Sequence, residues 1–149
     1  RHQVRGALEV ARMDPRPGCA PAALQALQRR LGHVFGDQLL LLRALGDYLV
    51  NKVRAEDIAC RYGGEEFVVI LPEASPEMSR SRAEELWKGV QGLHVNFHGA
   101  LLRGVTASVG VAAFPGHGKT AAELLRAADA AMYAAKRQGR DRVAIADLK

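Results

Sequence analysis

The chain has 149 residues, a length at which a single compact domain with a substantial core is the expected outcome. Apolar residues make up 48% of the chain and charged residues 25%, which excludes disordered, collagen-like and coiled-coil proteins. The formal net charge of +5 favours an anionic partner such as a nucleotide. We expect no nucleic-acid binding, because no basic run carries interleaved aromatic residues.

No apolar stretch approaches the roughly 18 residues that cross a bilayer, and the first residues do not resemble a signal peptide. Cys19 and Cys60 are too few for a disulfide framework and do not form a metal-type pair. We therefore expect a cytoplasmic domain without membrane contact. Because the chain begins at Arg1 and not at a methionine, we also expect it to be part of a longer protein.

The first third of the chain predicts a strand followed by two helices. Residues 7–13 form an apolar run that tolerates β structure, and two prolines follow it. Pro21 and the apolar spacing after it predict a helix that stops at Gly32. Asp37 is a candidate N-cap for a second helix that ends near Val53. The apolar stripe of this second helix consists of Leu41, Leu45, Tyr48 and Leu49.

The middle of the chain predicts a β-hairpin. Residues 58–62 and 67–71 are rich in β-forming side chains, and Gly63-Gly64 joins them. Ser75 and the proline after it then predict the start of an amphipathic helix. Core packing is the expected role of its single tryptophan, Trp87.

The last third predicts two further strands, a helix and a final strand. The run 105–113 reads as a strand in which Gly110 marks a bulge or a close approach. Thr120 to Glu123 forms a capping box for a helix that ends at Gly139. The remaining predicted strands are residues 101–102 and 142–145. We therefore expect an α/β (α+β) domain, with helices packed on a central mixed sheet that contains an antiparallel hairpin.

The hairpin turn is the most informative segment for chemistry. Gly63 and Gly64 allow a ligand to approach the backbone closely, and the carboxylates of Glu65 and Glu66 stand beside them. Mg²⁺ takes one or two protein carboxylates and completes its shell with water and phosphate oxygens. The segment therefore suits a polyphosphate and its metal, although an ordinary hairpin tipped by solvated acids has the same composition.

The residues Gly63 to Phe67 resemble the signature of GGDEF domains, in its GGEEF form. Residues 31–37 resemble the family's GHxxGD segment, and residues 105–115 resemble its VTxSxGVAxxP strand. Residues 128–140 resemble its ADxAxYxAKxxGR end. GGDEF domains are bacterial diguanylate cyclases, which condense two GTP molecules into the second messenger cyclic di-GMP.

The resemblance implies a single GGDEF-like domain over residues 1–149, divergent over residues 1–31, with the fold of a nucleotidyl-cyclase palm. It also implies a nucleotide site. Asp37 matches the family's guanine-reading aspartate, whose carboxylate accepts from N1–H and the 2-amino group. Lys136 and Arg140 match its phosphate-contacting pair; without the resemblance, they are solvated charges at a helix end.

The remaining implied site residues lie in the signature itself. Glu65 matches the metal-ligating acid, Glu66 stands beside it as a second catalytic carboxylate, and Gly63 and Gly64 match the backbone that closes over the nucleotide. The implied cofactor is Mg²⁺ and the implied ligands are cyclic di-GMP and GTP.

Arg54 and Asp57 form an RxxD tetrapeptide separated from Gly63 by five residues. At this spacing they resemble the family's inhibitory cyclic di-GMP site, in which arginine contacts phosphate or guanine and aspartate accepts from guanine. A surface salt bridge at a helix end is the alternative interpretation. Glu85 occupies the position of a third arginine that often assists from the neighbouring helix.

The resemblance fails before Gly32, where the family carries a DxDxFKxxND segment. An alignment without gaps places Ala20 at the metal-binding aspartate and Gln28 at the guanine-reading asparagine. Treating the proline-rich loop as an insertion instead places Arg12 at the metal position and Asp14 at the next acidic position. Neither alignment keeps the first aspartate, so we expect weakened Mg²⁺ binding, and Gln28 could still contribute to base recognition.

We therefore expect a degenerate GGDEF domain that binds cyclic di-GMP as a receptor or regulatory module, with weak or absent synthesis. An active diguanylate cyclase with an unusual metal ligand is the alternative, and a dimerisation domain without a ligand is the third hypothesis. Because cyclisation requires two GTP-loaded domains face to face, we expect a homodimer on ligand binding or in the full-length protein.

Overall fold

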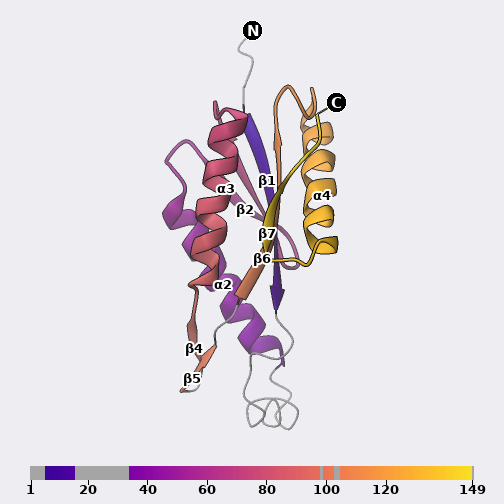
Figure 1. Cartoon of the computed structure of the whole chain (residues 1–149). Coiled ribbons are helices and arrows are strands. Elements are labelled where there is room, and N and C mark those ends of the chain that lie inside the picture. The colour runs from indigo at the N-terminus through magenta and orange to yellow at the C-terminus, as the bar shows by residue number, and fades with distance from the viewer. Residues whose placement is uncertain (1–5, 16–33, 98, 103–104, 149) are drawn as a thin grey trace.

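The computed structural model describes residues 6–15, 34–97, 99–102 and 105–148, with the backbone alone at residues 6–15, 34–38, 97 and 100. The elements, labelled as in Figure 1, are β1 (Gly6–Pro15), α2 (Val34–Lys52), β2 (Ile58–Gly63), β3 (Glu66–Pro72), α3 (Pro76–Gln91), β4 (Val95–Phe97), β5 (Ala100–Leu102), β6 (Val105–Ala113), α4 (Ala121–Arg137) and β7 (Arg142–Ile145). Among these described helices, none is long and apolar enough to span a membrane.

The strands form a mixed sheet in the order β2-β3-β1-β6-β7, and β4 and β5 form a separate two-stranded ribbon. Strand β1 lies in the centre and pairs antiparallel with both β3 and β6. Strands β2 and β3 form the predicted antiparallel hairpin, whereas β7 runs parallel to β6 after the α4 crossover. The predicted fold class, helices on a mixed sheet with an antiparallel hairpin, is confirmed.

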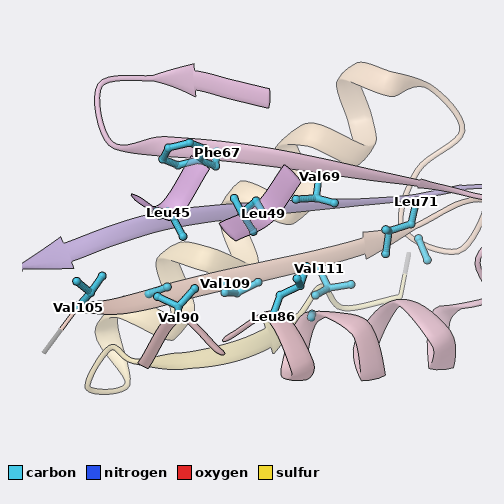
Figure 2. Packing of buried hydrophobic residues seen from close by; sticks show 13 residues of the cluster. Leu45, Leu49, Phe67, Val69, Leu71, Leu86, Val90, Val105, Val109 and Val111 are labelled. Carbon is cyan, nitrogen blue, oxygen red and sulfur yellow. The ribbon is translucent and has the colours of Figure 1, made fainter. Parts of the chain in front are cut away.

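The helices cover both faces of this sheet, with α3 and α4 on opposite sides (Figure 1). Along β3, Phe67 and Val69 belong to the core shared with α2 and α3, whereas Val68 belongs to the core shared with α4. Figure 2 shows Leu45 of α2 near Phe67, and Leu86 of α3 near the β6 residues. This alternation is what a strand buried on both faces requires.

Local signals explain where α3 and α4 begin. The hydroxyl of Ser75 accepts a hydrogen bond from the amide of Met78, and the hydroxyl of Thr120 accepts one from the amide of Glu123. The Glu123 carboxylate in turn accepts from the amide of Lys119, 2.7 Å away, which completes a capping arrangement. Both predicted helix starts are confirmed.

Gly110 lies at a close approach and not at a bulge. The pairing of β6 with β1 is continuous through Gly110. A Cβ there would lie 2.0 Å from the carbonyl oxygen of Ala128 and 2.4 Å from the amide nitrogen of Met132. Only a residue without a side chain lets α4 lie this close to the sheet.

Two sequence-based predictions need correction. Helix α2 begins at Val34, so Asp37 lies in its first turn and is not the N-cap. A helix favours acidic residues throughout its first turn, so the same residue type fits both positions. The prediction also missed β4, a three-residue strand whose only partner in the described chain is β5. The helix predicted between Pro21 and Gly32 lies outside the described residues.

Candidate nucleotide site

One row of residues across the sheet brings the signature motif together with distant parts of the chain. Gly63 pairs with Glu66, Glu66 with Arg12, Arg12 with Ser108, and Ser108 with Arg142. The row therefore joins the β2–β3 turn, the carboxyl-terminal part of β1 and the start of β7. The signature and Arg12, which are far apart in sequence, thus lie in one row across the sheet.

The signature turn differs in detail from the prediction. Strand β2 continues through Gly63, so the turn residues are Gly64 and Glu65 rather than the two glycines. The guanidinium of Arg61 donates from two nitrogens to the Gly64 carbonyl, at 3.0 and 2.5 Å, and thereby braces the turn. A Cβ added to Gly64 would meet nothing within 4 Å, so open space lies where a ligand could approach this backbone.

Both signature carboxylates are half-buried beside the turn. The Glu66 carboxylate lies over Gly63, with Oε2 3.5 Å from the place that a Cβ on Gly63 would take. Among the described residues, no group of three histidine, cysteine, aspartate or glutamate side chains is arranged to hold a metal ion. The carboxylates of Glu65 and Glu66 therefore do not by themselves make a built magnesium site.

Strand β1 supplies the residues that pair with the signature end of β3. It runs to Pro15, so both Arg12 and Asp14 lie on the strand, as the alignment with a loop insertion expects. Arg12 pairs with Glu66, and Asp14 lies two positions further on, opposite Thr106. An arginine thus occupies the strand position nearest to the signature. Ala20 and Gln28, the positions of the other alignment, lie outside the described residues.

The predicted phosphate-contacting residues lie at the end of α4 and in the turn after it. Lys136 is in the last turn of α4, and Arg140 follows the helix C-cap. The amide of Arg140 donates to the carbonyl of Ala135 at 3.0 Å, which folds the turn back onto the helix. Because Arg142 begins β7 in the same cross-strand row as Glu66, this turn lies at the signature's edge of the sheet.

The RxxD tetrapeptide forms a closed turn between α2 and β2. The Asp57 carboxylate accepts from the Arg54 amide at 2.9 Å, and the Asp57 amide donates to the Arg54 carbonyl at 3.1 Å. No ion pair in the described part of the chain joins the Arg54 guanidinium to Asp57. The salt-bridge interpretation is therefore wrong, because Asp57 binds the backbone of Arg54 and not its side chain.

Helix α3 contacts the last residue of α2, just before this turn, through an arginine that the motifs in the sequence do not single out. The Arg82 guanidinium donates to the carbonyl oxygen of Lys52 at 2.5 Å and pairs with the Glu85 carboxylate at 2.7 Å. Glu85, which occupies the place of the family's third arginine, thus binds an arginine one turn earlier. The i, i+3 spacing of the two residues was the signal in the sequence.

Comparison with known proteins agrees with this geometry. The family model described as "Diguanylate cyclase, GGDEF domain" matches residues 22–142. The response regulator PleD of Caulobacter vibrioides is 43% identical over 113 residues, which cover 75% of this chain and 24% of PleD. The chain belongs to the GGDEF domain family of diguanylate cyclases, and it spans about a quarter of the length of that relative.

Solved structures extend the similarity to the strand that precedes the family match. The GGDEF domain of PA1120 from Pseudomonas aeruginosa superposes with a TM-score of 0.78 at 29% sequence identity. The match covers 99% of this chain and 86% of the PA1120 chain. The GGDEF domain of DgcB from Caulobacter crescentus, solved in complex with c-di-GMP, superposes with a TM-score of 0.75 at 28% sequence identity. That match covers 95% of this chain and 78% of the DgcB chain.

Proposed function

We propose that this GGDEF domain is a cyclic di-GMP receptor or regulatory module in bacterial second-messenger signalling, with weak or absent synthesis. The observation that carries the proposal is the pairing of Arg12 with Glu66 on neighbouring strands. A cation at this strand position disfavours a divalent ion beside the signature, because like charges repel.

The fit of Mg²⁺ to the described residues is poor. Glu65 and Glu66 are adjacent carboxylates without a third ligand among the described side chains, and the strand next to them contributes an arginine position. Metal ions supply several kcal/mol of charge stabilisation to phosphoryl transfer. A domain that holds them weakly loses that part of catalysis, whereas recognition of a guanine base and a phosphate does not depend on it.

The RxxD turn supplies the ligand contacts that the receptor function needs. The Arg54 side chain is exposed, and the hydrogen bonds between Arg54 and Asp57 fix the two residues relative to each other. These bonds hold the backbone from which the Arg54 side chain projects, and its guanidinium can bind phosphate or guanine with two parallel hydrogen bonds. The cyclic di-GMP bound to the related DgcB domain is consistent with this ligand class.

A second function, synthesis of cyclic di-GMP from GTP, is favoured by one observation. The cross-strand row places Glu66, and with it the signature turn, at the same end of the sheet as Arg142, which follows the Arg140 turn. That arrangement suits a nucleoside triphosphate, with Lys136 and Arg140 at its phosphates and Asp37, in the first turn of α2, at its base. Synthesis would additionally require two such domains face to face.

Two measurements on the purified chain separate these functions. Titration calorimetry with cyclic di-GMP should show saturable binding, and incubation with GTP and Mg²⁺ should yield little or no cyclic dinucleotide. Rapid conversion of GTP to cyclic di-GMP would instead show that the chain is a cyclase. Absence of heat with both cyclic di-GMP and GTP would leave a dimerisation domain and would refute the receptor function.

A further inference from the structure

The turn between α4 and β7 has a backbone conformation that is disfavoured for two of its residues. Gly139, Arg140 and Asp141 have φ values of 109°, 60° and 47°, so three consecutive residues occupy the left-handed region. Glycine adopts it freely and aspartate tolerates it, but arginine does so rarely. Contacts from the surrounding structure must therefore hold this turn.

The main contact comes from α3, through the carboxylate of Asp141. The indole nitrogen of Trp87 donates to Oδ1 at 2.9 Å, and the side-chain amide of Gln91 donates to both carboxylate oxygens at 3.2 Å. Helix α3 is itself fixed, because Leu86 and Val90 are buried in the core against the sheet. The turn is thus attached to a helix that is packed into the core.

Arg140 is the residue that this attachment controls. Its amide is bonded to Ala135 at 3.0 Å, its carbonyl accepts from the guanidinium of Arg142 at 3.2 Å, and Asp141 is held by α3. With its amide and carbonyl both hydrogen-bonded and Asp141 held, the backbone from which the Arg140 side chain projects has one orientation. A cation presented in this way binds phosphate more tightly than one on a mobile turn, because less entropy is lost on binding.

We propose that Trp87 and Asp141 are positioning residues that hold Arg140 in the orientation in which it binds nucleotide phosphate. The proposal rests on the phosphate-binding role proposed above for Arg140. It assigns the single tryptophan of the chain a second task beside its packing against the core cluster. Such a task distinguishes it from a residue that only stabilises the fold.

The test compares GTP affinity, measured by titration calorimetry, in the intact chain and its variants. Trp87→Phe keeps an aromatic ring against the core cluster, although a smaller one, and deletes the indole N–H. We expect Trp87→Phe and Asp141→Ala each to weaken GTP binding about tenfold. Asp141→Asn keeps an acceptor oxygen and tolerates the left-handed backbone, so it should restore binding to within about threefold of wild type. Arg126 is an exposed cation on α4, away from the turn. Arg126→Ala is therefore the charge-matched control for Arg140→Ala and should bind GTP like wild type.

A double variant separates positioning from general stability. If the indole acts through Arg140, Trp87→Phe should cause no further loss in an Arg140→Ala background. Because the chain has one tryptophan, its fluorescence reports on the same contact. Asp141→Ala should shift the emission of Trp87 in the ligand-free protein, and GTP should change the emission of wild type but not of Arg140→Ala.

The proposal is overturned if Trp87→Phe binds GTP like wild type, or if its loss persists undiminished without Arg140. Saturable cyclic di-GMP binding with no response to GTP would overturn it as well while leaving the receptor function intact. A GTP response that follows the predicted pattern, with no cyclic di-GMP binding, would support the positioning role and refute the receptor function.

Discussion

Arg12 of β1, the central strand of the sheet, lies directly opposite Glu66 of its antiparallel neighbour β3. Glu66 belongs to the signature and Arg12 to the segment in which the family resemblance fails. The pairing therefore places the departure from the family pattern beside its most characteristic motif. It is the structural reason to expect a ligand-binding domain with impaired chemistry.

Replacing Arg12 with aspartate tests this relationship. The substitution places a carboxylate opposite Glu66 and should strengthen Mg²⁺ binding, so we expect production of cyclic di-GMP from GTP to rise at least about tenfold. Chromatography of the nucleotides after incubation measures the change. Arg126→Asp makes the same charge change on the exposed surface of α4 and should leave production at the wild-type level. Equal production by the two folded variants would contradict the role given to Arg12.

Gly64→Ala separates ligand approach from folding. A Cβ at Gly64 meets nothing within 4 Å, and the residue does not have a positive φ, so the free energy of unfolding should change by less than about 0.5 kcal/mol. GTP binding should nevertheless weaken about tenfold, because the methyl group occupies the space over the turn. Urea unfolding and calorimetry measure the two effects. Unchanged GTP affinity would show that no nucleotide approaches this backbone.

Gly110→Ala tests the contact between α4 and the sheet. The added methyl group would overlap backbone atoms of Ala128 and Met132, so we expect a loss of about 1–3 kcal/mol in the free energy of unfolding. Gly46→Ala is the matched control, because its Cβ would lie an ordinary 3.6 Å from the Phe67 ring in the middle of α2. It should stabilise the protein by up to about 1 kcal/mol. Similar unfolding midpoints for the two variants would contradict the packing described for Gly110.

The start of α3 predicts one dependence of stability on pH. A hydrogen bond from its own amide and one from Ser75 lower the pKa of the exposed Glu77 carboxyl below its ordinary value of 4.5. A carboxyl whose pKa is lower in the folded state stabilises the protein above the unfolded value and loses that contribution as the pH falls through the folded one. Wild type should therefore exceed Glu77→Gln in unfolding free energy at pH 7, and the difference should vanish as the pH falls well below 4.5. A difference that stays constant down to pH 3 would contradict this.

The sequence was informative wherever a local signal decides the structure. Ser75 and Thr120 cap helices, the apolar stripe of α2 faces the core, and Trp87 packs against the core cluster as predicted. The hairpin was also predictable, because two β-forming runs flank a short glycine turn. Asp37 was placed wrongly, because the sequence does not distinguish an acidic residue at a helix N-cap from one in the first turn of the helix.

Contacts between distant segments could not be predicted in this way. The bonds from Trp87 to Asp141 and from Arg82 to Lys52 join residues separated by 54 and 30 positions. Nothing in the local pattern of either partner indicates the other. The register of β1 could not be predicted either. Only the pairing of β1 with β3 shows that Arg12, and not one of its neighbours, lies opposite Glu66.

Calorimetric titration of cyclic di-GMP into wild type, Arg54→Ala and Lys52→Ala tests the receptor function most directly. Lys52→Ala removes an equal charge from an exposed residue two positions away and serves as the control for nonspecific attraction. We predict saturable binding by wild type and Lys52→Ala, and a loss of at least about tenfold in affinity for Arg54→Ala. Equal affinities for wild type and Arg54→Ala, or no binding by wild type, would contradict the assignment of the RxxD turn as the cyclic di-GMP site.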